Sequence, residues 1–429
     1  MIGFCSVKNK VQHKTNMETK TMIAADIAWM LVATALVLLM TPGVAFFYGG
    51  MVPLRSVVST KLQSFASMGF VTLLWAICGY SLVFSGDEGG VIGNLDYFLL
   101  SGVDMEPNPA YGPTIPHVLF MLFQATFAII TPALITGAVA ERVRFKAWLV
   151  IMALWSVLVY VPVAHWVWGP HGWIAAMGGL DFAGGMVVHM TSGYAALVAA
   201  VILGNRTNFR PDEQNSFSAL MVLLGGTLLW FGWIGFNAGS ALAANGLAAH
   251  AAATTILAAA AAMSTWMICD WTVHGRPTAV GSAVGAVAGL VAITPAAGYV
   301  SLQSALVIGA VTAVACNYAT RLVKTKLKTD DTVDVFACHG VGGTIGSILT
   351  AVFASSKVNP AIPDGLWAGD SKIFVANIVG SAVVIIYTMV MTYVVFKVVG
   401  FMMPVRVSEA EERSGLDVSQ HGEKAFALR

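Results

Sequence analysis

The stretch Asp181-Phe-Ala-Gly-Gly-Met-Val-Val-His189 places a carboxylate and an imidazole in a segment that is otherwise apolar. Placing a charged side chain at the centre of a bilayer costs about 2.5–3.5 kcal/mol on insertion scales. An intramembrane aspartate is therefore expected to be functional or to be buried in a network of polar groups. The spacing recurs, because His189 follows Asp181 by eight residues and His339 follows Asp331 by eight residues. Small residues follow each histidine, which predicts that one half of the protein is used twice.

The composition of the whole chain is that of a membrane protein. Of its 429 residues, 57% are hydrophobic and 10% are charged, and the mean hydropathy is +0.76, far too apolar for a soluble chain of this length. The formal net charge of +1 lacks the basic excess of nucleic-acid-binding proteins, so no nucleic acid is expected as a partner. The five cysteines are scattered without a Cys-x-x-Cys pair, and we interpret them as small hydrophobic residues rather than a disulfide or metal framework.

Apolar runs divide the chain into membrane-crossing segments. A helix needs about 20 apolar residues to cross the hydrocarbon core of a bilayer. We therefore predict an all-α polytopic membrane protein with eleven transmembrane helices, near residues 24–48, 61–85, 117–140, 147–167, 184–204, 217–238, 246–269, 279–299, 302–322, 335–354 and 372–403. They would form a transmembrane domain over residues 24–403, between an N-terminal extension of residues 1–23 and a regulatory tail of residues 404–429.

The loops between the spans differ in charge. The loops at one predicted membrane face carry twelve lysines and arginines. The loops at the other face carry two, and they include an acidic loop at residues 87–106. Because basic residues gather on the cytoplasmic side of a membrane protein, we expect the basic loops and the tail in the cytoplasm and the N-terminus outside. The internal loops outweigh the four lysines of the N-terminal extension, which favour the reverse.

Five spans in each half would enter the membrane in opposite senses, which is the inverted-repeat plan common among transporters. The repeat pairs spans 1–5 with spans 6–10, and span 11 leads into the tail. A second internal sequence similarity supports the repeat, because the run from Gly43 to Phe47 resembles the run from Gly232 to Phe236. The 43 glycines and the alanine run 258–262 would allow the close helix contacts that hold spans together in lipid.

Six short motifs follow one another along the chain. They are Phe-Tyr-Gly-Gly at 47–50, Phe-Gln-Ala-Thr-Phe-Ala at 123–128, Ala-Glu-Arg-Val-Arg-Phe at 140–145, Asp-Phe-Ala-Gly-Gly at 181–185, Gly-Trp-Ile-Gly-Phe-Asn-Ala-Gly-Ser at 232–240 and Asp-Val-Phe-Ala-Cys-His-Gly at 334–340. With the tail motif at 415–426, they resemble the ammonium transporter family over nearly the whole chain from Ala24. The resemblance implies a cell-membrane homotrimer in contact with lipid. It also implies ammonium or ammonia as substrate, a PII-type signal protein as cytoplasmic partner, no cofactor and no enzymatic activity.

The resemblance also assigns roles to individual residues. The implied residues are Phe127, Trp168, Ser240 and Asp181 for ammonium recruitment, Phe127 and Phe236 for a gate, His189, His339 and Trp233 for the pore, and Arg406, Glu411, Asp417 and His421 for the regulatory tail. Aromatic faces attract a cation by about 0.5–2 kcal/mol each, and a serine hydroxyl can accept an ammonium hydrogen. The loop between Trp168 and Asp181 is one residue longer than the commonest family pattern.

Each of these roles has a simpler structural explanation. Membrane aromatic residues mostly form interfacial belts or pack, a lone histidine is usually a satisfied core residue, and a charged tail is often only solvated. An aspartate before Gly-Gly would cap a helix, and we expect Asp181 both to cap and to favour cations. Two histidines at equivalent positions of a repeat favour a pore. No metal is expected, because two nitrogens without nearby cysteine or carboxylate ligands leave a zinc site incomplete.

An apolar pore favours ammonia over the intact ion. Carrying an ion through dry protein costs on the order of tens of kcal/mol before compensation, whereas deprotonation costs about 1.36 kcal/mol per pKa unit. The expected mechanism is therefore recruitment of ammonium, deprotonation, and conduction of ammonia past the histidines with a separate proton relay. This excludes potassium, which has no proton to release.

Three alternative functions compete with transport. An intramembrane enzyme would need a nucleophile beside a base or an open metal site, and the sequence offers neither. An ammonium sensor of the same fold would share every pore motif, although no signalling domain is recognised in the chain. A Rhesus-type ammonia gas channel is disfavoured by Trp168 and by the tail motif.

Overall fold

A computed structural model describes residues 22–86, 89–211 and 216–426, and these ranges are helical apart from loops and two isolated bridges. Ten helices of the described ranges are long and apolar enough to cross a membrane. This confirms the predicted all-α membrane protein. The lysine-bearing part of the N-terminal extension, residues 1–21, and residues 87–88 of the acidic loop lie outside the described residues.

The first half of the chain supplies five of the ten helices. The first is α1 (Ala24–Met51), and the second runs from η1 (Leu54–Ser56) through α2 (Val57–Leu74) and the π-helical turn η2 (Trp75–Gly79) to α3 (Tyr80–Phe84). The third is α4 (His117–Val139), and the fourth joins α5 (Phe145–Trp155), the π-helical turn η4 (Ser156–Tyr160), α6 (Val161–Trp168) and the short α7 (Trp173–Ala176). The fifth is the π-helical turn η5 (Gly185–Met190) with α8 (Thr191–Leu203). A short 3₁₀ turn, η3 (Phe98–Leu100), lies in the loop before α4.

The second half supplies the other five. They are α9 (Ala219–Gly239); α10 (Gly246–His274); α12 (Leu302–Arg321) with the π-helical turn η6 (Leu322–Lys326); the π-helical turn η7 (Phe336–Val341) with α13 (Gly342–Phe353); and α14 (Lys372–Met402). The 3₁₀ turn η8 (Leu366–Ala368) precedes α14, and the short helices α15 (Glu409–Ser414) and α16 (Leu416–His421) form the tail.

The predicted span 279–299 differs from the structure. Its helix, α11 (Ala279–Ile293), has only 15 residues and is followed by turns over residues 294–299. Pro295 lacks the N–H that would continue the helical ladder, so the helix ends just before it. This early end matters for the site, because it places Thr294 inside the protein, fully buried.

Polar residues in the sequence fix where the helices of the second half begin. Ser218, Asn245, Thr278 and Ser301 each accept a hydrogen bond from a first-turn backbone N–H, at the starts of α9, α10, α11 and α12. A side-chain cap of this kind stabilises a helix by about 1 kcal/mol, since it satisfies a donor that has no partner within the helix.

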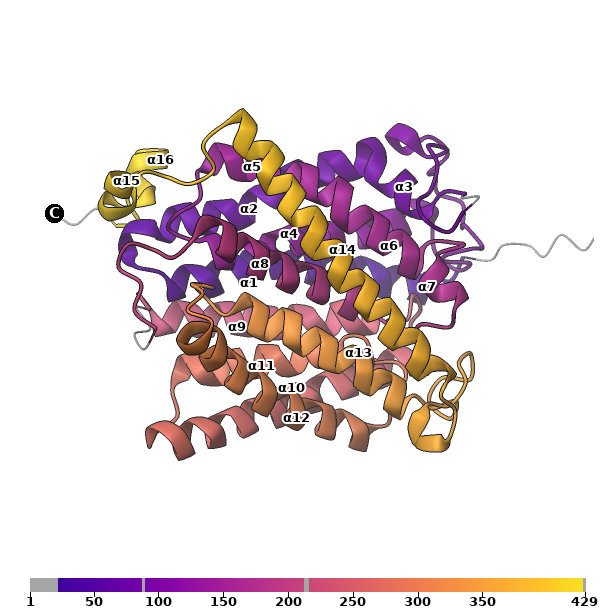
Figure 1. Ribbon diagram of the computed structural model, residues 1–429. Helices are drawn as coiled ribbons and strands as arrows, with labels where there is room; N and C mark the ends of the chain where they lie inside the picture. The colour runs from indigo at the N-terminus through magenta and orange to yellow at the C-terminus, as the bar shows by residue number, and fades with distance from the viewer. Residues whose placement is uncertain (1–21, 87–88, 212–215, 427–429) are drawn as a thin grey trace, which may run out of the picture.

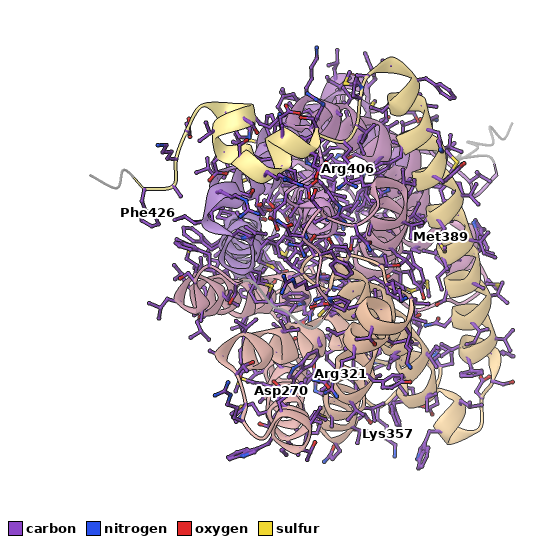
Figure 2. All side chains as sticks on the ribbon, turned by 60° about the vertical axis from the view of Figure 1, so that its left-hand side comes forward. Asp270, Arg321, Lys357, Met389, Arg406 and Phe426 are labelled. Atoms are coloured by element: carbon purple, nitrogen blue, oxygen red, sulfur yellow. The ribbon has the colours of Figure 1, made fainter. Side chains whose placement is uncertain are left out.

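The two halves of the chain pack against each other. Figures 1 and 2 show α1 to α8 on one side and α9 to α13 on the other, with α14 running across both. At the contact of α1 with α9, a Cβ atom on Gly225 would lie 2.3 Å from the backbone nitrogen of Phe47, so only glycine fits there. Small residues thus bring the halves into backbone contact, as expected for helices in lipid.

The two ends of the helix bundle carry different segments. The tail packs at one end, which we call the tail end, while α7 and the loop before α4 lie at the opposite, far end (Figure 1). The basic loops that follow α1, α4, α8 and η6 all reach the tail end, where Arg142, Arg206 and Arg406 are held by hydrogen bonds between these loops. The charge asymmetry of the sequence is therefore an asymmetry of the two ends.

Candidate functional site

Three of the predicted aromatic residues meet between α4, α6 and α9. The rings of Phe127 and Phe236 lie 4.2 Å apart between centroids, and both side chains are fully buried. Trp168 stands edge-on to Phe127, at 5.8 Å and 88°. The hydroxyl of Ser240, one turn beyond Phe236, donates to the Phe236 carbonyl at 2.9 Å, which leaves its oxygen able to accept a hydrogen bond. The four residues thus combine aromatic faces with one hydroxyl acceptor.

Asp181 lies directly beside this aromatic group. Its two carboxylate oxygens accept hydrogen bonds from four successive backbone N–H groups, those of residues 184–187, at 2.6–3.3 Å. Gly184 supports the cap with φ of 119°, a conformation that favours glycine. The Trp168 indole N–H donates to the Asp181 backbone carbonyl at 3.1 Å, so the cap and the aromatic group are joined. Asp181 therefore caps η5 and sets a carboxylate behind Trp168.

The two histidines meet because their helices approach at glycines. A Cβ atom on Gly193 of α8 would lie 2.0 Å from the backbone nitrogen of Gly340 in η7. This contact brings the Nδ1 atoms of His189 and His339 to 3.2 Å, with 1% and 4% of the two residues exposed. Each histidine lies in a π-helical turn whose start is capped by an aspartate, Asp181 for η5 and Asp331 for η7.

A chain of hydrogen bonds assigns the protons of the two neutral rings. The Thr294 hydroxyl donates to the Leu290 carbonyl at 2.8 Å and accepts from the Trp233 indole N–H at 2.8 Å. The Thr294 Oγ1 atom lies 3.3 Å from His189 Nε2. With the threonine proton on the Leu290 carbonyl, its remaining lone pair accepts from His189 Nε2–H. His189 Nδ1 then accepts from His339 Nδ1–H, and His339 Nε2 keeps a free lone pair. The pair thus ends in one acceptor nitrogen.

A narrow, almost wholly apolar cavity contains the histidine pair, and we call it the lumen. Its lining residues come from both halves and are Met40, Val44, Phe47, Tyr48, Ile130, Leu134, Val188, His189, Leu229, Trp233, Phe236, Val287 and His339. Phe236 separates the lumen from Trp168 and Phe127, and Tyr48, whose hydroxyl donates to the Leu134 carbonyl at 3.1 Å, lines its wall. Within the described residues no group of three potential metal ligands occurs.

Sequence reasoning missed two residues of this site. Tyr48 belongs to a motif quoted only for its resemblance, and Thr294 belongs to none. The position of Thr294 had one sequence signal, because the proline after it ends an apolar run before it is long enough to span. Its role as acceptor for Trp233 and His189 needs three segments that are distant in sequence, so no local pattern could reveal it.

The four predicted tail residues contact loops and helix starts at the tail end. Arg406 donates to the carbonyls of Leu203 and Asn205 at 2.6 and 2.8 Å, and Figure 2 shows it where the tail meets the bundle. Glu411 completes a capping box at the start of α15 and binds Arg144 at 2.9 Å. Asp417 accepts from the backbone N–H groups of residues 58 and 59, and His421 packs edge-on against Phe145. The tail is thus a packed element.

A buried ionic cluster lies between the tail and the lumen. The Arg142 guanidinium is fully buried and donates to the Thr332 hydroxyl at 2.8 Å and to the backbone carbonyl of Asp330, whose carboxylate lies 3.7 Å away. Arg206 donates to the same carboxylate at 2.8 Å and also binds Glu141. Burial alone would raise the pKa of Asp330, but Arg142 and Arg206 outweigh it and hold that pKa below its usual value.

Replacing Asp330 by alanine should destabilise the folded protein by about 3–5 kcal/mol, because it leaves Arg142 as a buried charge without its counter-charge. Thermal unfolding in detergent measures this as a lower midpoint. The exposed Glu409, which binds Arg413 one helical turn away, provides the control, since Glu409→Ala should cost at most about 1 kcal/mol. Equal midpoints for the two variants would contradict a stabilising role for the cluster.

The stability difference between wild type and Asp330→Ala should also depend on pH. Because the pKa of Asp330 is lower in the folded than in the unfolded state, its ionisation stabilises the protein at pH values above about 4, and that contribution disappears as the pH falls below this range. The difference in unfolding midpoint between wild type and Asp330→Ala should therefore shrink on acidification below pH of about 4.

Comparison with known proteins gives one consistent result. The sequence profile of the Ammonium Transporter Family matches residues 28–426. An ammonium transporter of Bacillus subtilis is 46% identical over 401 residues, which cover 94% of this chain and 98% of that protein. The crystal structure of Saccharomyces cerevisiae Mep2 superposes with a TM-score of 0.86 at 36% identity, over 95% of this chain and 93% of that chain. A solved structure described as a sensor Amt protein gives a TM-score of 0.85 at 29% identity, over 92% and 98%.

Proposed function

Because the chain belongs to the ammonium transporter family, we propose that it recruits ammonium at the aromatic group, deprotonates it and conducts ammonia through the lumen. The family consists of transporters rather than enzymes, and the chain is an integral membrane protein. The recruiting residues are Phe127, Trp168 and Ser240, with the Asp181 carboxylate behind them, and Phe127 and Phe236 form the gate that ammonia must pass.

The observation that carries the proposal is the hydrogen-bonded histidine pair in an apolar cavity. Ammonia can donate a hydrogen bond to the lone pair of His339 Nε2, whereas an intact cation finds no carboxylate among the described residues of the lumen wall to replace its lost hydration. Trp233 supports the pair by fixing Thr294, the acceptor for His189. The proton released at the gate travels separately, through the imidazoles, and neither ring needs to carry a lasting charge.

A current measurement tests this function. Purified protein in liposomes should give a transient current or a pH change on a jump in ammonium concentration, and no response to equal jumps in potassium or sodium. An electrically silent protein that still moves ammonia would instead fit the Rhesus-type gas channel. Absence of any ammonium response in well-reconstituted liposomes would contradict transport altogether. The likeness to a sensor protein extends to the whole fold and so gives no reason to prefer sensing.

Replacing Trp168 by leucine should raise the half-saturating ammonium concentration about 2- to 30-fold. One aromatic face contributes about 0.5–2 kcal/mol of cation binding, and each 1.4 kcal/mol is a factor of about ten in affinity. The initial rate of ammonium-evoked current against concentration gives the value. Trp271→Leu, on an exposed face of α10, is the control and should leave the concentration unchanged. If Trp168→Leu and Trp271→Leu gave the same half-saturating ammonium concentration, Trp168 would not belong to the recruitment site.

We propose that the tail end faces the cytoplasm and the far end faces outward, in the cell membrane. The gathering of arginines and lysines at the tail end supports this, since such residues are retained on the cytoplasmic side. The likeness of η5 to η7, each with a capping aspartate and a histidine, supports the inverted repeat of five spans in a domain of residues 24–403. Protease access to the tail in intact cells would contradict this orientation.

We further propose a homotrimer and regulation of the tail, residues 404–429, by a PII-type signal protein. Family membership supports the trimer, and the mass of the detergent-solubilised protein tests it, a stable monomer being the contrary result. The packing of Asp417 and Arg406 onto the loops of the bundle supports a regulatory tail. Deletion of residues 407–429 that leaves both PII binding and transport unchanged would contradict it.

A further inference from the structure

A second cavity lies at the tail end, directly beyond the lumen. Its lining residues are Met51, Arg206, Phe209, Arg210, Ser216, Val280, Lys324, Thr332, Val333 and Asp334. The boundary between the two cavities lies at Gly137 of α4, where an added Cβ atom would be 2.4 Å from Val333 Cγ2 and 2.9 Å from the ring of Tyr48. Since Tyr48 lines the lumen and Val333 lines the second cavity, the second cavity is the tail-end mouth of the pore.

A lysine and an aspartate face each other in this mouth. The Nζ atom of Lys324 lies 2.8 Å from both carboxylate oxygens of Asp334, and their side chains are only 12% and 6% exposed. Asp334 has φ of 64°, a left-handed conformation that costs a residue other than glycine about 1–3 kcal/mol and persists only where the surroundings impose it. The backbone therefore holds this carboxylate toward the lysine.

The head group of Lys324 has the chemistry of the transported ion. A lysine side chain ends in an alkylammonium group with three N–H donors, and a free ammonium ion offers the same kind of donors to the same acceptor. Among the residues that line the mouth in the described part of the chain, Asp334 is the only acidic one, while Arg206, Arg210 and Lys324 are basic. The one carboxylate able to bind ammonium there is already occupied.

We propose that Lys324 is a specificity-determining residue whose tethered ammonium group occupies the cation site of Asp334 and so prevents ammonium on the tail-end side from entering the pore. The inference rests on the proposed function, because it adds a direction to that transport. At the far end a recruited ion meets aromatic faces and an open hydroxyl. At the tail end it meets a carboxylate already filled by Lys324, beside Arg210 and beside Arg206, which is paired with Glu141 and Asp330. Entry should therefore be easier from the far end than from the tail end.

Transport in the two directions tests the proposal. Membrane vesicles of both orientations are prepared, with sidedness read from antibody access to the tail, and the initial ammonium-evoked response is measured from each face. Lys324→Met keeps the unbranched stem but removes the ammonium group, which frees a mostly buried carboxylate for a cation. We expect the ratio of tail-end entry to far-end entry to rise about tenfold, which corresponds to about 1.4 kcal/mol.

Two further variants separate the site from general disturbance of the loop. Lys324→Met combined with Asp334→Asn removes the freed carboxylate, so the ratio should return toward the wild-type value. Lys326→Met, on the exposed part of the same turn, should keep the wild-type ratio. An unchanged ratio in Lys324→Met, or a raised ratio that persists in the double variant, would overturn the proposal.

Wild-type vesicles provide a test that does not depend on any variant folding. At equal gradients the response from the far end should exceed the response from the tail end, and equal responses would overturn the inference. A wild-type protein that responds equally from both faces would still be an ammonium transporter. A protein with no response from either face would contradict the proposed function itself, so the two failures are distinguishable.

Discussion

Replacing Asp181 by alanine should abolish ammonium transport, with a fall of at least about 100-fold in the initial ammonium-evoked response. The carboxylate accepts from four backbone N–H groups at the start of η5, and each buried donor left without a partner costs about 1–3 kcal/mol. The same change removes the negative charge beside Trp168. Transport is measured per folded protein, with the folded fraction taken from size-exclusion chromatography, so that loss of protein is not counted as loss of activity.

Two conservative variants separate the cap from the charge. Asp181→Asn keeps an acceptor oxygen and removes the charge, whereas Asp181→Glu keeps the charge on a longer stem and should retain part of the transport. If the charge matters, Asp181→Asn should be folded but strongly impaired. Wild-type transport in Asp181→Asn would show that Asp181 acts only as a cap, and wild-type transport in Asp181→Ala would refute both roles.

Replacing His189 or His339 by glutamate should let potassium leak through the pore. Among the described residues that line it, the lumen of the wild-type protein offers a cation no carboxylate, only largely apolar side chains, the Tyr48 hydroxyl, which donates to Leu134, and the two imidazoles, so dehydration of an ion is not compensated. A carboxylate at either position supplies a fixed negative charge and draws in water, which stabilises a hydrated cation along the path. Potassium currents should therefore rise from background to the same order as the ammonium currents in both variants.

The control for this substitution is a histidine outside the lumen. His250 of α10 binds the Val300 carbonyl at 2.8 Å and does not line the cavity, so His250→Glu should leave potassium excluded. All currents are recorded in liposomes at matched protein density. If both pore variants exclude potassium as well as the wild type does, the histidines are packing residues and selection takes place entirely at the aromatic group.

Much of the fold could be predicted because it follows from local patterns. Apolar runs predicted the long helices, and the Asp-x-x-Gly-Gly pattern predicted a helix start at the glycine pair, where η5 begins at Gly185. The sequence predicted a loop after Trp168 one residue longer than the commonest family pattern, and the structure still brings the Trp168 ring edge-on to Phe127. Length changes in a surface loop need not reach the residues that it connects.

The features that escaped prediction all depend on contacts between distant segments. The proton assignment of the histidines requires Thr294 to meet Trp233, and the ionic cluster requires Arg142 to meet Asp330. In the sequence, Lys324 is one of twelve basic loop residues, and nothing there identifies its partner. The structure identifies Asp334, whose left-handed backbone conformation directs its carboxylate to Lys324. Charge patterns gave the end of the bundle at which these residues lie but not their partners.

The contact of Gly193 with Gly340 has a consequence for how the pore comes into being. A ribosome delivers the chain from its N-terminus, so α1, α4 and η5 enter the membrane before α9, α11 and η7 exist. Every part of the lumen wall needs both groups of helices, and the histidine pair closes only when residues 336–341 dock against α8. A chain synthesised only as far as α8 therefore has one side of the lumen wall and no histidine pair, so it contains no complete pore.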